Sequence, residues 1–334
     1  MSRKNLQVLL ANRPTGWVQE RDFRLVETEL ASPGEEEVLV KNLYLSLDPY
    51  MRGRMNDAKS YAPQVELGAV MVGATVGVVV ESHHPHFQVN DTVWGFLGWQ
   101  KYSVSHGRNL RKVAVSEQLP ASVYLGPLGM PGVTAWIGLL EIGKPQPGET
   151  VVVSAASGAV GSVVGQLAKR KGCRVVGIAG GKEKCEYVVR ELAFDSCVDY
   201  KAGNLIEDLA QATPDGIDVY FENVGGEILD AVLGRLNTFA RIPLCGLVSQ
   251  YNETQPRAVR NFISLGTNRV KLQGFFSGDY TDIWPSIIQE LGQMVASGQL
   301  KYHETIVEGL ENAPAAFIGM LKGQNLGKQL VKLA

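Results

Sequence analysis

A short segment in the middle of the chain has the residue types that hold a dinucleotide. Val151-Val-Val-Ser-Ala-Ala-Ser-Gly-Ala-Val-Gly161 runs from an apolar stretch into a turn of small residues. Such a turn lets backbone approach a pyrophosphate, and the N–H groups and dipole of a following helix favour its negative charge. A tight strand-to-helix turn that binds nothing is the alternative. The residues of the predicted phosphate turn are Ala156, in the first glycine position of G-x-G-x-x-G, then Gly158, Ala159, Val160 and Gly161.

The next predicted strand indicates which nucleotide is bound. An NAD site ends this strand in Asp or Glu, which holds the ribose 2′-hydroxyl. Here Val175-Val-Gly-Ile-Ala-Gly-Gly181 contains no acidic residue, and Lys182-Glu-Lys184 follows it. The glycines leave room for a 2′-phosphate and the lysines offer positive charge, so NADPH is favoured over NADH. An ordinary solvated helix start is the alternative for both lysines.

The residue patterns of zinc-dependent and serine-dependent catalysis are not found in the sequence. The four cysteines, at 173, 185, 197 and 245, have no paired metal spacing, which indicates a reduced chain without a disulfide frame or zinc cluster. His83-His84-Pro85-His86 is interpreted as a solvated hairpin tip, with adventitious metal binding as the alternative. No G-x-S-x-G elbow is present. The acid–base groups left near a cofactor are hydroxyls, chiefly those of tyrosines.

Length and composition limit the number of domains, the class of protein and its possible partners. A length of 334 residues suggests two domains, and 45% hydrophobic with 20% charged residues is typical of a globular protein. The 32 Lys and Arg nearly balance the 34 Asp and Glu, so neither nucleic acid nor an anionic membrane is expected as a partner. The chain shows no signal-peptide core and no apolar run near the ~20 residues of a membrane span. A cytoplasmic location is therefore expected.

The first ~120 residues are predicted to be rich in β-strands. Short runs of β-branched and aromatic residues are separated by Gly, Pro, Asn and Asp, and no long stretch has helical spacing. A compact barrel or sandwich is the expected form. The predicted strands cover 38–42, 69–81, 92–96 and 101–104.

From residue 127 the pattern changes to alternating strands and helices. After a helix over 127–141, apolar strands alternate with amphipathic helices, which is typical of a parallel sheet with right-handed crossovers. The domains are therefore expected at 1–126 and 127–299, with a tail, 300–334, that packs back on the first domain. Predicted strands cover 150–155, 174–179, 196–199, 216–221, 240–245, 270–275, 301–307 and 328–331, and predicted helices cover 159–171, 183–193, 281–297 and 312–321.

Several stretches together resemble the zinc-independent medium-chain dehydrogenase/reductases, in their double-bond reductase branch. The resemblance spans nearly the whole chain, and the motifs are specific in combination although none is specific alone. It implies an α/β protein: a GroES-like β-rich catalytic domain, a Rossmann domain with a doubly wound parallel sheet, and a cofactor between them. The motifs are Leu45-Ser-Leu-Asp-Pro-Tyr-Met-Arg-Gly-Arg54, Leu128-Gly-Met-Pro-Gly-Val-Thr-Ala135, Ala155–Gly161, Glu222-Asn-Val-Gly-Gly226, Cys245-Gly-Leu-Val-Ser-Gln-Tyr-Asn252 and Met320-Leu-Lys-Gly-Gln-Asn-Leu-Gly-Lys328.

The resemblance implies that no catalytic or structural zinc is bound. Zinc-dependent relatives carry a Cys in the first domain and a Gly-His-Glu motif, where this chain has Leu47-Asp48-Pro49 and Gly68-Ala69-Val70. The family's lobe of clustered cysteines is missing as well. Glu222 stands where some relatives have Asp.

The resemblance also assigns roles to individual residues. Lys184 matches the lysine at the 2′-phosphate, and Tyr200 matches the tyrosine that helps to hold it. Tyr251 resembles the tyrosine beside the nicotinamide ribose, whose hydroxyl can support the proton step. Tyr50 and Met130 are expected at the substrate mouth. The remaining cofactor positions are Gly181, Asn223, Cys245, Gly246, Phe275, Phe276 and Asn325. Packing alone is the alternative for Tyr50, Tyr200 and Cys245.

The activity implied is reduction of the carbon–carbon double bond of α,β-unsaturated aldehydes and ketones by NADPH, with curcumin-like diarylheptanoids among the candidate substrates. Hydride would go to the β-carbon and a proton to the α-carbon. A quinone reductase and a zinc-free allylic alcohol dehydrogenase are the enzymatic alternatives, and an NADPH-binding scaffold without turnover is a third. The resemblance also implies a homodimer in which Rossmann sheet edges meet.

Overall fold

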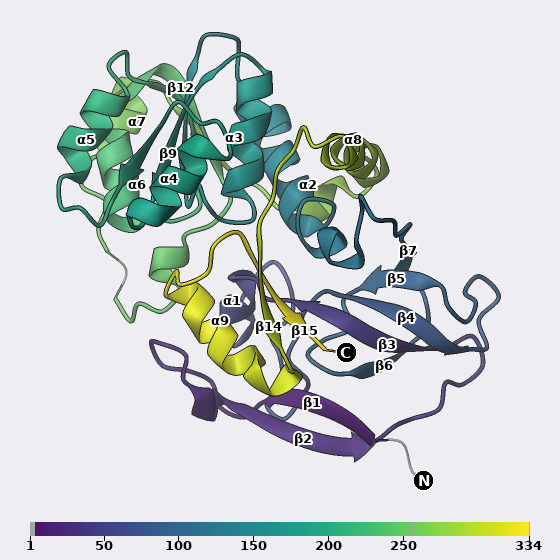
Figure 1. The fold of residues 1–334 in the computed structure, drawn as a ribbon. Helices are drawn as coiled ribbons and strands as arrows, with labels where there is room; N and C mark the ends of the chain where they lie inside the picture. Colours follow the sequence, from purple (N-terminus) through teal and green to yellow (C-terminus); the bar gives the residue numbers. More distant parts are fainter. Residues whose placement is uncertain (1–3, 256, 334) are drawn as a thin grey trace. The chain divides into compact units, whose positions relative to one another are not determined.

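The computed structural model describes residues 4–255 and 257–333 and divides the chain into two compact units (Figure 1). One unit combines Met1–Leu125 with Glu304–Ala334, and the other is Gly126–His303. The first unit breaks off after residue 125, where the sequence predicted a boundary at 126. The second unit ends at residue 303, where the sequence predicted an end at 299. The C-terminal segment belongs to the same unit as the N-terminal one.

The first unit is built from antiparallel β-structure. Its seven-stranded sheet has the order β14-β15-β3-β4-β5-β7, with β6 also paired to β3, and β1 and β2 form a separate two-stranded sheet. The C-terminal strand β15 pairs antiparallel with β3, with Val331 opposite Leu45 (Figure 1, yellow beside purple). The bounds are β1 Lys4–Leu10, β2 Phe23–Glu29, β3 Val38–Ser46, α1 Tyr50–Arg54, β4 Thr75–Ser82, β5 Thr92–Gly95, β6 Tyr102–Ser105, β7 Arg111–Lys112, β14 Glu304–Glu308, α9 Ala313–Leu321 and β15 Lys328–Lys332.

The second unit contains the predicted parallel sheet. Its six strands have the order β10-β9-β8-β11-β12-β13, and each neighbouring pair is parallel. The bounds are α2 Met130–Trp136, β8 Thr150–Ser154, α3 Gly161–Arg170, β9 Arg174–Ala179, α4 Lys182–Arg190, β10 Ser196–Asp199, α5 Leu205–Ala212, β11 Ile217–Phe221, α6 Gly226–Leu233, β12 Leu236–Leu244, α7 Ile263–Thr267, β13 Lys271–Gly274 and α8 Trp284–Ala296.

Strand β8 shows why this sheet is covered on both faces. Val151, Val152 and Val153 are all fully buried, although successive side chains of a strand point to opposite faces. Val152 packs into the core that α5 and α6 share with the sheet. Helix α3 also packs against β8 and β9. The apolar run of β8 thus reflects a doubly wound sheet.

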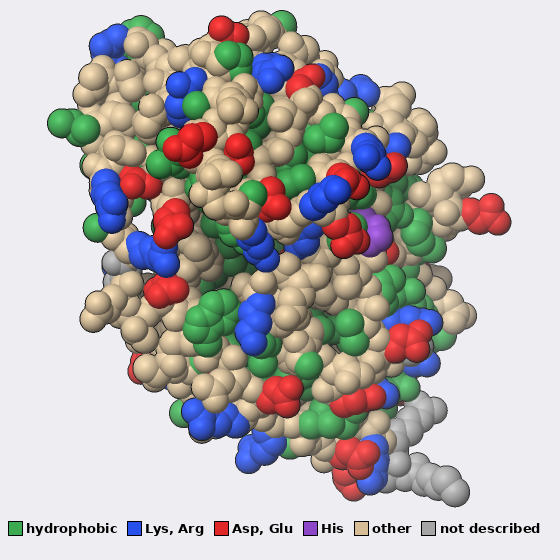
Figure 2. Space-filling model, turned by 60° about the vertical axis from the view of Figure 1, so that its left-hand side comes forward, with side chains coloured by type: hydrophobic (Ala, Val, Ile, Leu, Met, Phe, Trp, Pro, Cys, Tyr) green, Lys and Arg blue, Asp and Glu red, His purple; other side chains and the backbone are tan. Residues whose placement is uncertain are grey.

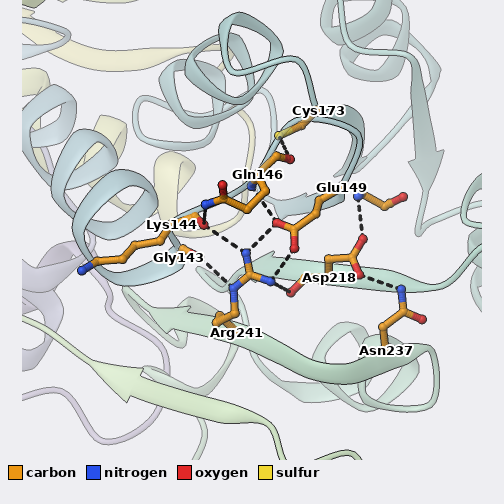
Figure 3. Close-up of polar contacts among 9 residues, drawn as sticks. Gly143, Lys144, Gln146, Glu149, Cys173, Asp218, Asn237 and Arg241 are labelled. Carbon is orange, nitrogen blue, oxygen red and sulfur yellow. Dashed lines mark hydrogen bonds and ion pairs between the residues drawn. The ribbon is translucent and has the colours of Figure 1, made fainter.

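An ion pair between Arg241 and Glu149 lies at the end of the parallel sheet opposite the phosphate turn (Figure 3). Arg241 of β12 donates to both carboxylate oxygens of Glu149, with Nη1–Oε1 2.9 Å and Nη2–Oε2 2.6 Å. Its Nε also donates to the carbonyl oxygen of Gly143 at 3.0 Å. The guanidinium therefore ties β12 to the segment that leads into β8.

The strand predicted over 69–81 begins only at Thr75, and the helix predicted over 127–141 begins only at Met130. This helix is split into α2 and a π-helical segment, Ile137–Gly143. Gly138 in this segment lies against two rings, since an added Cβ would come within 2.5 Å of both Phe221 and Phe275. The first unit also contains a short α-helix that the strand pattern did not predict, α1. Predicted strand 301–307 is shifted to Glu304–Glu308.

Charge on the surface is mixed. Figure 2 shows Lys and Arg side chains interspersed with Asp and Glu side chains over the described residues of one face. This agrees with a formal net charge of −2. Among the described helices, none combines the length and apolar character needed to cross a membrane.

Candidate active site

The predicted phosphate turn connects the end of β8 to α3. Ala155 adopts a left-handed conformation (φ +49°), and its carbonyl oxygen accepts a hydrogen bond from the N–H of Gly158 at 2.9 Å. A Cβ on Gly161 would collide with that same carbonyl. Gly161 is therefore required by the close approach of the turn to the first residue of the helix.

Helix α3 begins at Gly161, two residues later than predicted (161 against 159), because Ala159 and Val160 are still part of the turn. Within the described residues no side chain caps this terminus, and its first turn carries no acidic residue. Uncapped N–H groups at the end of a ten-residue helix favour an anion. Ala156, Gly158, Ala159, Val160 and Gly161 thus lie together in an arrangement that fits a pyrophosphate.

A positively charged corner lies at the ends of β9 and β10. The pKa of the Lys184 ammonium is lowered by burial and then by the neighbouring charge of Lys201. A Cβ on Gly180 would lie 2.8 Å from the ring of Tyr200 and 2.9 Å from Cε of Lys201. The Lys201 ammonium lies 5.9 Å from the centre of the Tyr200 ring. Two lysines and a phenol around a glycine fit a 2′-phosphate.

Asp199 organises this corner through backbone contacts. Its Oδ1 accepts hydrogen bonds from the N–H of Gly181 at 2.7 Å and of Lys201 at 3.0 Å. Gly181 has φ +98° and precedes α4. The sequence reasoning assigned no role to Lys201 or Asp199, although their position directly beside Tyr200 was an available signal.

Asn223 is held at the ends of β8 and β11. Its Nδ2 donates to the carbonyl oxygen of Ser154 at 2.7 Å, and its N–H is bonded to Ser154 Oγ at 2.8 Å. Glu222 Oε1 accepts from the Ser154 hydroxyl at 3.0 Å and from the N–H of Val224 at 2.6 Å. Burial raises the pKa of Glu222. This network was not predicted, apart from Asn223 itself.

Cys245, Gly246 and Tyr251 lie close to one another after β12. The N–H groups of Cys245 and Gly246 both donate to the carbonyl oxygen of Glu222, at 2.9 and 3.2 Å. The Tyr251 hydroxyl oxygen accepts from the N–H of Leu247 at 3.4 Å, and a Cβ on Gly246 would lie 3.0 Å from it. Burial raises the pKa of the Cys245 thiol to about 12. The Tyr251 hydroxyl thus lies at the backbone of the two residues that follow Cys245.

The other predicted residues of this unit lie in different surroundings. Phe275 packs edge-on against Phe221, with ring centres 6.3 Å apart. Phe276 is 38% exposed. Met130 begins α2. The structure places Phe275 in packing contacts and leaves the ring of Phe276 accessible.

Two predicted residues belong to the first unit. Asn325 Nδ2 donates to the carbonyl oxygen of Gly327 at 2.8 Å, so its amide holds the turn before β15. Tyr50 begins α1 and lines a pocket with Arg54. Burial is the main cause that raises the pKa of Tyr50, and the charge of Asp48 adds to it.

No group of three or more His, Cys, Asp and Glu side chains is arranged to hold a metal ion in the part of the chain that the structure describes. In the histidine cluster, the N–H of His86 donates to Nδ1 of His84 at 3.1 Å. This contact closes a local turn.

The chain is similar to known families and proteins over nearly its whole length. Residues 6–113 match the family described as N-terminal domain of oxidoreductase, and residues 159–293 match the family described as zinc-binding dehydrogenase. The chain is 52% identical to the NADPH-dependent curcumin reductase of Escherichia coli, over 99% of this chain and 98% of that protein. It is 44% identical to the NADP(+)-dependent 2-alkenal reductase of Nicotiana tabacum, over 99% and 98%.

A solved structure shows the same fold. The crystal structure of CurA from Vibrio vulnificus in complex with NADPH superposes with a TM-score of 0.94, at 48% identity over 98% of this chain and 99% of that one. The chain belongs to the medium-chain dehydrogenase/reductase family, in its double-bond reductase branch. The predicted family, the α/β fold class and the oxidoreductase class are confirmed, and the predicted cofactor agrees with the relatives.

Proposed function

We propose that the protein reduces the carbon–carbon double bond of α,β-unsaturated aldehydes and ketones, with curcumin-like compounds among its substrates. Whole-length similarity to a curcumin reductase and a 2-alkenal reductase carries this proposal. NADPH would supply the hydride that is added to the β-carbon. The α-carbon of the resulting enolate then gains a proton.

The chain's own residues bind and orient the reactants in this proposal. The turn around Gly158 and the start of α3 would hold the pyrophosphate, and Lys184 with Lys201 would hold the 2′-phosphate. Asn223, fixed by Ser154, and Gly246 would line the cofactor. As the family resemblance implies, Phe275, Phe276, Cys245 and Asn325 are also proposed to contact the cofactor, and Tyr50 and Met130 to contact the substrate.

Tyr251 is proposed to support the proton step. Its hydroxyl lies at the backbone of Gly246 and Leu247, and the N–H of Leu247 donates to it at 3.4 Å. A phenol so positioned donates a hydrogen bond to developing negative charge and passes a proton. Tyr251→Phe is expected to lower kcat about 100-fold with a smaller change in KM. An unchanged kcat would remove Tyr251 from the mechanism.

The direct test follows NADPH consumption by the purified protein with enals, enones, curcumin and quinones, and product identity by mass spectrometry. Saturated aldehydes and ketones are the expected products. Preferred oxidation of NADPH by quinones would replace the proposal with a quinone reductase, and turnover of allylic alcohols with NADP⁺ would replace it with a dehydrogenase. A cofactor-induced rise in Tm without any substrate turnover would indicate a binding scaffold.

We also propose that the unit containing Tyr50 is the GroES-like catalytic domain and that the protein is a cytoplasmic homodimer. The four free cysteines support a reducing compartment. Strand β13 lies at the edge of the parallel sheet, and Leu272 on it is 39% exposed. An open edge with apolar side chains is suited to pairing with a second copy. Light scattering of wild type and Leu272→Lys tests this, since the variant is expected to shift toward the monomer.

A further inference from the structure

The first unit contains a pocket that combines apolar walls with one guanidinium group. Its volume is about 280 Å³, slightly below the ~300–1,000 Å³ of complete ligand pockets. It therefore has the size of a subsite that takes part of a ligand. Tyr50 and Arg54 line it together with the apolar residues Val70, Met71, Phe96 and Leu97.

Two polar groups of this pocket are buried without partners. The Tyr50 hydroxyl and the Nε and Nη1 atoms of Arg54 have no hydrogen bond to any residue that the structure describes. Buried donors of this kind are rare in native proteins, because each loses its water without a replacement. Both groups therefore point to an acceptor that a ligand would bring.

The neighbouring Arg52, on the same helix, has a guanidinium that is hydrogen-bonded within the protein. Its guanidinium donates to Asn56 Oδ1, to the carbonyl oxygen of Gly16 at 2.9 Å and to that of Pro14 at 3.4 Å. Arg52 thus fastens α1 to the loop between β1 and β2. Arg54 makes no comparable contact with the described residues.

The carboxylate whose charge acts on Tyr50 is already paired with another group. Asp48 raises the pKa of Tyr50 through its charge, but its Oδ1 is paired with the buried ammonium of Lys328 at 3.1 Å and its Oδ2 accepts a hydrogen bond from Ser46. No described carboxylate forms an ion pair with Arg54. The positive charge of Arg54 is therefore left for a ligand.

We propose that Tyr50 and Arg54 form a subsite for a negatively charged oxygen of the substrate. The phenol and the guanidinium both donate hydrogen bonds, and the charged donor favours an anionic acceptor over a neutral one. Two sources supply such an oxygen: a carboxylate carried elsewhere on the substrate, or the enolate oxygen that develops as the double bond is reduced. The inference rests on the proposed function and extends it to a residue with no assigned role, Arg54.

Three matched substrates test the subsite: a linear enone ending in a methyl group, the same enone ending in a carboxylate, and the methyl ester of that acid. Each is assayed with wild type, Arg54→Met, Arg54→Lys and the control Arg24→Met, an exposed arginine of β2. Arg54→Met is expected to lower kcat/KM about tenfold or more, and Arg54→Lys to restore part of the loss. Arg24→Met should match wild type.

The pattern of loss identifies the oxygen. A rise in KM confined to the carboxylate-ended enone assigns the subsite to a substrate carboxylate, and an equal fall in kcat for all three assigns it to the enolate. The proposal is overturned if folded Arg54→Met keeps wild-type kcat and KM with every substrate. If wild type reduces none of them, the proposed function fails, and calorimetric binding of the saturated keto acid against its ester then tests the subsite alone. Equal affinity for acid and ester, unchanged by Arg54→Met, would overturn it.

Discussion

The methyl group of Ala156 faces the backbone of Gly177, where an added Cβ would lie 2.8 Å from it. Ala156 holds the first glycine position of the phosphate turn, and Gly177 lies on the adjacent strand β9, opposite Val153. A Cβ at Gly177 would also lie 2.9 Å from Val188 Cγ1 and 3.2 Å from Cys197 Sγ. The room that an alanine needs in this turn is thus provided by a glycine on the neighbouring strand.

Gly177→Ala is therefore expected to destabilise the protein by about 1–3 kcal/mol through overpacking and to weaken NADPH binding. Combining it with Ala156→Gly should recover part of the loss, because the removed methyl makes room for the added one. Urea unfolding and NADPH titration of the two single variants and the double variant measure this coupling. Gly266→Ala, whose added Cβ meets nothing within 4 Å, is the control. Strictly additive effects would contradict the pairing.

Lys184 and Lys201 are expected to decide the choice of cofactor. Replacing either by Ala should raise the Kd for NADPH about tenfold to a hundredfold, the loss of one hydrogen bond to a charged group, and leave the Kd for NADH nearly unchanged. Fluorescence titration with both cofactors measures this. Lys171→Ala, an exposed lysine after α3, is the control. Equal losses for NADPH and NADH would show that these lysines act on the fold and not on the 2′-phosphate.

Glu222→Gln is expected to stabilise the protein above neutral pH. Burial raises the folded-state pKa of Glu222 above its ordinary value of 4.5, so the native state binds more protons and loses stability as pH rises through that pKa. Gln keeps the acceptor at Oε1 and replaces the unpartnered Oε2. The gain is expected at about 1–3 kcal/mol near pH 8 and should shrink near pH 5.

Thermal unfolding of Glu222→Gln, wild type and the exposed control Glu207→Gln across that pH range tests this expectation. A constant difference between Glu222→Gln and wild type at all pH values would contradict it.

Cys185 is expected to be the first of the four thiols to be alkylated. The thiol of Cys197 donates to the sulfur of Cys185 and lowers the pKa of Cys185, whereas burial raises the pKa of Cys173 to about 11 and that of Cys245 to about 12. The thiolate is the reactive form, so iodoacetamide should modify Cys185 first. Peptide mass spectrometry over time measures the order. Cys197→Ala should slow the modification of Cys185, and faster labelling of Cys245 would contradict the assignment.

The sequence alone was sufficient to predict the phosphate turn and the alternating strands and helices around it. Val151–Gly161 forms a strand, a turn and a helix start from neighbouring residues, so spacing along the chain is enough. The preference for NADPH came from the same kind of signal, since Lys184 lies in the first turn of α4, shortly after the two glycines that follow β9. Helix ends were less predictable: α3 begins after Val160 because the turn itself takes two further residues.

Contacts between distant residues were decided only by the tertiary structure. Lys201 joins Lys184 because β10 lies beside β9, and the helix over 127–141 changes to π-helical geometry where Gly138 meets Phe275. Arg52 and Arg54 are alike in sequence, yet only Arg52 finds carbonyl partners in the fold. Local spacing determines which residues share a turn. Which side chains are buried, paired or left facing a pocket depends on segments that meet only when the sheet is complete.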